Sequence, residues 1–301
     1  MLVDLTEVLK NTRKERYAVG LFNTTDTDML EAVITAAEEL RSPVIIGTAE
    51  VLLPYGELKL IAPSMIEAAK RARVPVAVHF DHGLTFERCL EALDLGFTGI
   101  MFDGSLGGFE DNIARTSEAV YAAHSRGVPV EGEIGHVGEA AGRDNEDTDR
   151  YTAVADAVEF VSRTGADALA VAIGTAHGAY KTRPKLDFER LEEIRGNVDV
   201  PLVLHGGSGL PDKDIQKAIA CGISKINVFT DLCAAGETAM RDGLREGLSY
   251  LEIRDKRVNY IKDAVKNKIR IFGSGDKACR HPWPFLKNGE KKRVKRPRPP
   301  I

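Results

Sequence analysis

Three histidines each stand where an apolar run ends. His82 lies in VAVHFDHG, His177 in ALAVAIGTAHG and His205 in PLVLHGGSG. In a chain of alternating strands and helices, the carboxyl ends of the strands open on one face, so side chains distant in sequence meet there. Three neutral imidazoles suit Zn²⁺ and leave a fourth position for water or a substrate oxygen, with cobalt and manganese as alternatives. A single histidine would indicate only a hydrogen-bonded rim residue, but three at corresponding strand ends favour a divalent-metal site.

Carboxylates accompany these histidines at the strand ends. Asp81 directly precedes His82 and could move a proton to or from an oxygen of a bound substrate. Its alternative role is to orient a histidine through the second ring N–H. Asp103 and Glu133 end two further predicted strands and could hold a second cation or tune the first. Glu131 is the rival of Glu133, because residues two apart share one face of a strand.

The remaining histidines fit less demanding roles. His79 shares the strand face of Asp81, which indicates interior packing or support of a metal ligand. His136 lies in the longest irregular stretch, residues 135–150, whose glycines and charges are typical of a functional loop at a catalytic rim. His124 in a predicted helix and His281 near the carboxyl terminus are expected at the surface.

Backbone segments suited to phosphate follow the seventh and eighth predicted strands. Glycine lets the main chain approach an anion, and successive N–H groups form a nest. In barrels, the loops after strands seven and eight commonly bind phosphate. The predicted phosphate-binding residues are Gly178, Gly206, Gly207, Ser208, Asn227, Val228, Phe229 and Thr230. A metal beside phosphate indicates a phosphorylated carbonyl substrate and aldol cleavage, isomerisation or epimerisation. Lys225 begins its predicted strand, so no obvious buried lysine is offered for a Schiff base.

Eight strand-like runs alternate with amphipathic helical stretches. The predicted strands are Ala18–Phe22, Val44–Gly47, Val76–His79, Gly99–Phe102, Val130–Ile134, Ala168–Ile173, Leu202–His205 and Lys225–Val228. The predicted helices between them include Asp28–Leu40, Phe86–Leu95, Asn112–Ala123, Ala153–Thr164, Phe188–Arg195 and Asp212–Ala220. Eight βα units in about 230 residues favour an α/β fold with a closed TIM (β/α)8 barrel. An open dinucleotide-binding sheet is disfavoured because no GxGxxG follows the first strand.

Extra helices are expected after the barrel. We predict them within residues 231–271 and expect them to pack against a partner subunit, which indicates a homodimer or homotetramer. Residues 1–278 are predicted to form one barrel domain, and residues 279–301 a basic, disordered, proline-rich tail. From Cys279 onward there are eight lysines or arginines and one glutamate, a net charge of +7. Because the whole chain carries −4, its body carries −11 and offers no footprint for nucleic acid. A basic tail could contact nucleic acid or an acidic lipid surface, but we interpret this one as a solvated extension.

The composition is typical of a soluble globular protein, with 43% hydrophobic and 29% charged residues. The four cysteines form no CxxC pair, which fits a reducing compartment. Neither a signal peptide nor an apolar run of ~18 residues is visible. The sequence therefore predicts a cytoplasmic protein without a membrane partner.

Taken in order, these motifs resemble the class II, zinc-dependent ketose-bisphosphate aldolases, which include fructose- and tagatose-bisphosphate enzymes. The matching segments, spread from Phe22 to Gly275, are HFDHG, MFDGS, EGEIGHVG, AVAIGTAHGAY, LVLHGGSG and SKINVFT.

The resemblance implies Zn²⁺ on His82, His177 and His205. It implies that Asp81 is the proton donor and acceptor at the hydroxyl of the cleaved bond. Asp103 and Glu133 match positions that hold a second divalent ion in some members. The phosphate-binding residues named above match a pocket for dihydroxyacetone phosphate, beside which a monovalent cation such as Na⁺ or K⁺ assists several members. The implied reaction is reversible cleavage of a ketose 1-phosphate or 1,6-bisphosphate to dihydroxyacetone phosphate and an aldehyde.

The chain departs from the family pattern at two places. Many members have a VGGxED-like loop whose acid deprotonates dihydroxyacetone phosphate, where this chain reads VGEAAGRDNEDTD. The candidates for that acid are Glu139, Asp144, Glu146 and Asp147. FNTTDTD stands where many members have FNVNN, so the aldehyde and the number of phosphates stay open. The carboxyl-terminal KNKIRIFGSG is closer to the tagatose-type branch. The alternatives are a metal-dependent sugar-phosphate isomerase or epimerase and a non-catalytic barrel subunit.

Overall fold

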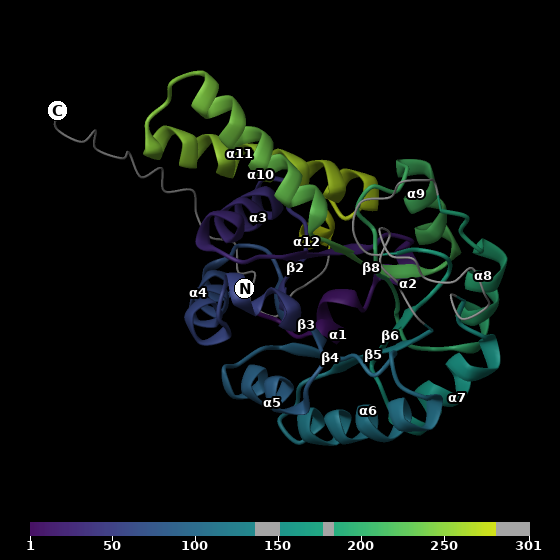
Figure 1. The fold of residues 1–301 in the computed structure, drawn as a ribbon. Helices are drawn as coiled ribbons and strands as arrows, with labels where there is room; N and C mark the ends of the chain where they lie inside the picture. Colours follow the sequence, from purple (N-terminus) through teal and green to yellow (C-terminus); the bar gives the residue numbers. More distant parts are fainter. Residues whose placement is uncertain (136–150, 177–183, 281–301) are drawn as a thin grey trace.

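Eight parallel strands close into a barrel in which each strand pairs with the next and β8 pairs with β1 (Figure 1). The computed structural model describes residues 1–135, 151–176 and 184–280. The strands are β1 (Val19–Asn23), β2 (Val44–Ala49), β3 (Val76–Gly83), β4 (Gly99–Phe102), β5 (Val130–Ile134), β6 (Ala168–Val171), β7 (Leu202–Leu204) and β8 (Ile223–Val228). The predicted (β/α)8 barrel is confirmed.

Helices alternate with the strands and surround the barrel (Figure 1). They are α1 (Leu5–Leu9), α2 (Thr12–Glu15), α3 (Thr27–Glu39), the 3₁₀ helix η1 (Glu50–Tyr55), α4 (Leu58–Arg71), α5 (Phe86–Asp94), α6 (Phe109–His124), α7 (Val154–Thr164), α8 (Phe188–Asn197), α9 (Asp212–Cys221), α10 (Thr230–Arg245), α11 (Tyr250–Phe272) and α12 (Lys277–Arg280). Side-chain caps begin several of them. Asp26 accepts from the N–H groups of Asp28 and Met29 at the start of α3, and Asp187 accepts from Arg190 N–H in α8.

The inside of the barrel is apolar at one end and polar at the other. Leu5, Val8 and Leu9 of α1 are almost fully buried, and they pack with inward-facing strand residues such as Val19 and Ile45. Helix α1 therefore fills the amino end of the barrel, so that this end is a packed core and not an open channel. The polar strand ends are left to form a site at the carboxyl end.

The predicted extra helices are confirmed as a long hairpin of α10 and α11. The hairpin packs on α3 and projects from the barrel (Figure 1). Gly243 of α10 allows a close approach, because a Cβ there would lie 2.8 Å from Ile253 Cγ1 of α11. Arg254 forms an ion pair with Asp28 and so ties α11 to α3.

The boundary between barrel and tail stays a prediction. Helix α12 begins before the predicted boundary at residue 278, and its Ala278 N–H donates to Arg41 O over 3.0 Å. Residues 281–301 lie outside the described part of the chain. No helix in the described part is both long and apolar enough to cross a membrane.

Candidate active site

Asp81 and His82 both line the cavity at the carboxyl end of the barrel although they are neighbours in one strand. Successive side chains of a regular strand point to opposite faces. Here the register of β3 against β4 shifts between Phe80 and Gly83, and His82 has a φ of 41°. That left-handed conformation is uncommon for a residue other than glycine. The irregular strand end therefore presents two consecutive polar side chains to one place.

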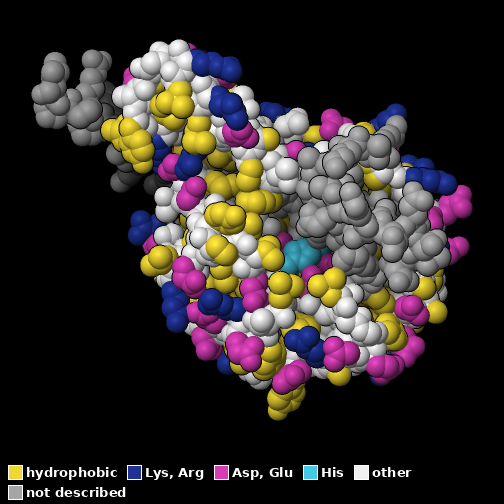
Figure 2. All heavy atoms as spheres, viewed as in Figure 1, with side chains coloured by type: hydrophobic (Ala, Val, Ile, Leu, Met, Phe, Trp, Pro, Cys, Tyr) yellow, Lys and Arg dark blue, Asp and Glu magenta, His cyan; other side chains and the backbone are white. Residues whose placement is uncertain are grey.

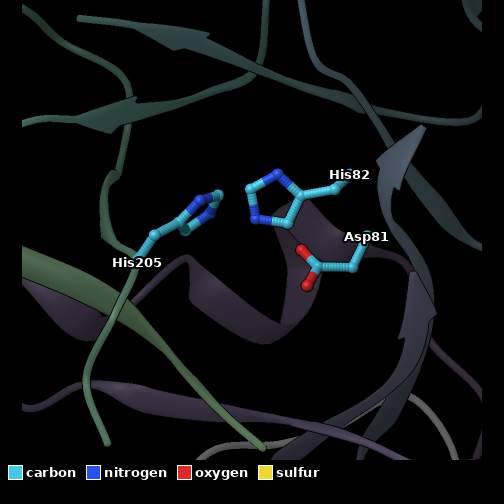
Figure 3. Close-up of side chains that lie close together, drawn as sticks. All are labelled: Asp81, His82 and His205. Carbon is cyan, nitrogen blue, oxygen red and sulfur yellow. The ribbon is translucent and has the colours of Figure 1, made fainter. Parts of the chain in front are cut away.

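Asp81, His82 and His205 converge at this end of the barrel. One ligand atom from each of the three lies within 4.8 Å of the others. The rings of His82 and His205 have centroids 4.4 Å apart, and they point toward one another beside the Asp81 carboxylate (Figure 3). Since β3 and β7 are separated by three strands on either side, only closure of the barrel makes this meeting possible.

Three carboxylates hold the two imidazoles. Asp103 Oδ2 lies 2.7 Å from His82 Nδ1, and Ser105 donates to the other oxygen of Asp103 from its N–H and its hydroxyl. His205 lies between Glu131 (Nε2 to Oε1, 3.0 Å) and Glu133 (Nδ1 to Oε2, 2.9 Å). The two rival glutamates therefore both contact the same histidine. Asp103 and Glu133 also form a second donor group with His82.

Two amides and an ammonium fix the Asp81 carboxylate, which is fully buried. Asn23 Nδ2 donates to Asp81 Oδ2 over 2.8 Å, and Asn227 Nδ2 donates to both carboxylate oxygens over 2.8 and 3.0 Å. Burial alone would raise the pKa of Asp81, but the positive charge placed near it by His82 and Lys225 lowers that pKa below its usual range. The carboxylate is thus kept charged and oriented.

Lys225 is buried, although its expected place at the start of a strand had offered no obvious buried lysine for a Schiff base. Strand β8 begins at Ile223 rather than at Lys225, so the lysine side chain points into the barrel and is fully buried. Its Nζ lies 2.8 Å from Glu131 Oε2, 2.8 Å from Asn227 Oδ1 and 3.9 Å from Asp81 Oδ1. With three acceptors around it, this ammonium serves as a fixed charge, which argues against use as a Schiff-base nucleophile.

The predicted phosphate residues and the donor groups line one cavity of about 400 Å³. A histidine is visible in the corresponding hollow near the centre of the face in Figure 2. The cavity is lined by Asn23, Ala49, Val51, Leu52, Asp81, His82, Leu84, Asp103, Ser105, Leu106, Glu133, Gly206, Gly207, Ser208, Asn227, Val228, Phe229 and Thr230. Every predicted phosphate residue in the described part of the chain is therefore brought to the donor groups.

Gly206 and the start of α10 give this side of the cavity features that suit an anion. Gly206 has a φ of 67°, and a Cβ there would clash with the carbonyl oxygen of Ala176, so only glycine fits. Thr230 is the first residue of α10, whose amino-terminal N–H groups and dipole favour a negative charge.

Several predicted residues lie outside the described part of the chain. These are His177, Gly178, His136, Glu139, Asp144, Glu146, Asp147 and His281. The other histidines take the predicted kinds of position. His79 is fully buried, with its Nε2 3.7 Å from Glu131 Oε2, and burial lowers its pKa to about 4. His124 pairs with Asp167 outside the barrel, over 2.8 Å.

The charges of the site fit a divalent cation. Four buried or half-buried carboxylates surround the two imidazoles, and Lys225 supplies one positive charge against them. Burial acts to lower the pKa of His205, but Glu133 and Glu131 raise it to about 10. This excess of negative charge favours a cation at the imidazoles, and mixed imidazole and carboxylate donors suit Zn²⁺.

Comparison with known proteins decides the family. A family model described as "Fructose-bisphosphate aldolase class-II" matches residues 3–277. The chain belongs to this family. The fructose-bisphosphate aldolase of Staphylococcus aureus strain Mu50 is 41% identical over 286 residues, which are 92% of this chain and 99% of that protein. That of Geobacillus stearothermophilus is 42% identical over 289 residues, with the same coverage.

A solved structure supports the assignment of both fold and family. The YdjI aldolase of Escherichia coli K12 superposes with a TM-score of 0.83 and 38% sequence identity, covering 92% of this chain and 100% of that one. Class II aldolases are lyases that use a divalent metal and act on phosphorylated sugars. The candidate donor groups at the carboxyl end of the barrel agree with such a metal.

Proposed function

We propose that the chain catalyses reversible aldol cleavage of a ketose 1-phosphate or 1,6-bisphosphate to dihydroxyacetone phosphate and an aldehyde. One observation carries the proposal. A charged, immobilised carboxylate, two facing imidazoles and a glycine-rich anion cradle line or adjoin a single cavity. The relatives named fructose-bisphosphate aldolase support a phosphorylated ketose as the class of substrate.

His82 and His205 would hold Zn²⁺, with His177 as the third ligand expected from the sequence. When bound, Zn²⁺ supplies Lewis acidity to the substrate carbonyl. Asp103 and Glu133, which form a donor group with His82, would take a second divalent ion. A monovalent cation such as Na⁺ or K⁺ beside the phosphate is proposed from the family resemblance.

Asp81 would take the proton of the hydroxyl next to the breaking bond and return it in the synthetic direction. Its lowered pKa keeps it a carboxylate, which is the form that accepts a proton. Asn23 and Asn227 hold both of its oxygens, so the carboxylate is oriented before the substrate arrives. We propose Glu139, Asp144, Glu146 and Asp147 as the candidates for the second acid, which deprotonates dihydroxyacetone phosphate.

The phosphate of dihydroxyacetone phosphate would bind in the cradle after β7 and β8. Gly206 and Gly207 allow the backbone to approach an anion, and Ser208 and Thr230 add hydroxyl donors. Asn227, Val228 and Phe229 also line this side of the cavity. Gly178 is proposed as a further phosphate-binding residue from the sequence alone.

The chain would act as a homodimer or homotetramer in the cytoplasm. Leu244, Tyr250 and Leu251, at the end of the projecting hairpin, are 71%, 83% and 68% exposed, and apolar side chains gather over this part of Figure 2. A second copy of the chain would cover them. The free cysteines Cys89 and Cys221 support a reducing location.

The test is a coupled assay for dihydroxyacetone phosphate with a panel of phosphorylated ketoses. Enzyme freed of metal should be inactive, and Zn²⁺ should restore turnover. His205→Ala should lose metal and activity while circular dichroism shows an intact fold. Interconversion of ketoses without release of dihydroxyacetone phosphate would support an isomerase or epimerase instead, and full turnover by His205→Ala in metal-free buffer would refute the ligand role.

Asp81→Ala separates the proton-transfer role from metal binding. We expect zinc to be retained and cleavage to fall by about 10²–10⁴-fold, the usual contribution of a general acid–base group. Exchange of the dihydroxyacetone phosphate proton should partly survive, because another acid removes it. Complete loss of exchange, measured by NMR in D₂O, would assign Asp81 a different task.

A further inference from the structure

The cavity has two chemically different walls. One wall is the anion cradle, in which Gly206, Gly207 and Ser208 follow β7 and Phe229 and Thr230 follow β8. On the other side, the lining residues after β2, β3 and β4 are largely aliphatic: Val51, Leu52, Leu84 and Leu106. Because the strands follow one another in order around the barrel, β3 and β4 stand across the mouth from β7 and β8. Leu84 and Leu106 therefore face the anion cradle, and Val51 and Leu52 lie beside them after β2.

The donor groups lie between these walls. His82 comes from the wall side and His205 from the cradle side, and their rings meet 4.4 Å apart (Figure 3). A ketose whose phosphate occupies the cradle must place its carbonyl at these groups and the breaking bond at Asp81. The remaining carbons, which leave as the aldehyde, then extend toward the aliphatic wall.

Among the described residues, this wall offers no cationic side chain to a second phosphate. Within residues 1–135, 151–176 and 184–280, no lysine or arginine lines the cavity, whereas Asp103 and Glu133 do. Two backbone N–H groups just before α5 already donate to a carboxylate of the protein. Glu50 accepts from the N–H groups of Leu84 and Thr85 over 2.8 and 3.0 Å and from the Thr85 hydroxyl over 2.9 Å. A phosphate on the aldehyde half would lose water and meet aliphatic carbon and carboxylates.

We propose that the aldehyde half of the preferred substrate carries no charge, and that Val51, Leu52, Leu84 and Leu106 select it. This inference rests on the proposed aldolase function and makes it more specific: the substrate is a ketose 1-phosphate with an uncharged tail rather than a 1,6-bisphosphate. Leu106 is 78% exposed and Val51 59% exposed, so both have surface that a substrate chain can cover.

The test uses the zinc-loaded full-length protein in the synthetic direction. Dihydroxyacetone phosphate is held constant, and glyceraldehyde is compared with glyceraldehyde 3-phosphate. The wild type should show a kcat/KM at least about tenfold higher for glyceraldehyde, within the range by which pockets discriminate closely related substrates. Leu106→Lys places a cation on the wall and should move the ratio of the two kcat/KM values toward the phosphorylated aldehyde by about tenfold.

Leu60→Lys is the matched control. Leu60 is 79% exposed on α4 and does not line the cavity, so this variant gains the same charge and should keep the wild-type ratio. A wild type that prefers glyceraldehyde 3-phosphate, or a ratio that Leu106→Lys leaves unchanged, would overturn the assignment of the wall. If dihydroxyacetone phosphate is consumed with neither aldehyde, the proposed aldolase function itself is refuted.

Discussion

One buried ammonium links the two halves of the site at the level of single residues. Lys225 contacts Asn227, which holds Asp81, and it contacts Glu131, which holds His205. The carboxylate proposed for proton transfer and a proposed metal ligand are therefore positioned by the same charge. This arrangement buries the ion pair of Lys225 and Glu131. Removal of either partner would leave an uncompensated buried charge, which destabilises the folded state.

Lys225→Met should destabilise the fold strongly, because it leaves the Glu131 carboxylate buried without its main countercharge. We expect the free energy of unfolding, measured with urea, to fall by about 3–5 kcal/mol. The double variant Lys225→Met/Glu131→Gln should recover much of this loss, since the uncompensated charge is gone. Lys213→Met, on the exposed face of α9, is the control and should change little. Equal destabilisation by the single and double variants would contradict a role for the pair.

Glu131 also predicts how stability depends on pH. Burial acts to raise its pKa, but Lys225 and His205 together lower it from 4.5 to about 2. A carboxyl group with a lowered pKa in the folded state stabilises that state above its unfolded pKa. This contribution is therefore present above pH 4.5 and is lost as the pH falls toward 2. The urea stability of wild type should decline over that interval more steeply than that of Lys225→Met/Glu131→Gln, and parallel profiles would contradict the assignment.

At the scale of elements, the loop after β7 shows how backbone shape builds the anion cradle. Gly206→Ala should impair the cradle in two ways, through its φ of 67° and through the clash of a Cβ with Ala176 O. The left-handed conformation alone costs about 1–2 kcal/mol for a residue with a Cβ. Gly127→Ala is a matched control, because Gly127 has a φ of 70° and no atom within 4 Å of the place that a Cβ would take. Only Gly206→Ala should raise the KM for dihydroxyacetone phosphate, and similar kinetics in both variants would refute the role of the cradle.

The hairpin of α10 and α11 predicts the assembly state. Leu244 lies in the last turn of α10 and Leu251 in the first turn of α11. Both side chains are largely exposed. If a second copy covers them, Leu244→Glu/Leu251→Glu should shift sedimentation of the protein toward the monomer. The variant Leu60→Glu on α4, at similar exposure, should sediment as wild type. A wild type that sediments as a monomer would remove the basis for the proposed oligomer.

At the scale of the whole molecule, the order of strands and helices was open to prediction from the sequence, whereas the contacts inside the barrel were not. Runs such as that of Val44–Ala49 are fully buried because helices and barrel interior cover both faces, and such runs read as strands without further knowledge. Helix α4 was not predicted, and neither was the continuation of β3 to Gly83 along β2. Both features depend on packing and strand pairing between segments that are distant in the sequence.

The site illustrates the same limit. Strand ends indicated His82, His205 and Asp81, because residue type and position are visible in a sequence. The buried position of Lys225 was missed, because it depends on where β8 begins and on acceptors from β5 and β3. A lysine two residues before an asparagine in an apolar run was the signal that could have revealed it, since both then face the barrel interior.

The described barrel closes without the basic tail. Phe272 O accepts from Ala18 N–H over 3.0 Å, so the end of α11 is joined to the residue before β1. Lys277 pairs with Glu15 over 2.7 Å, and the family match ends at residue 277. These contacts, which join the segment after α11 to the barrel, lie before residue 281.

Deletion of residues 281–301 should therefore leave the catalytic unit whole. We expect the melting temperature to change by less than about 2 °C, because a shift of 2–4 °C corresponds to about 1 kcal/mol in a domain of this size. The kcat/KM should stay at the wild-type value. The deletion removes seven lysines or arginines, so any salt-sensitive binding to DNA or heparin should disappear with it. A loss of turnover in the truncated protein, at an unchanged melting temperature, would show that the tail belongs to the active site rather than to solvent.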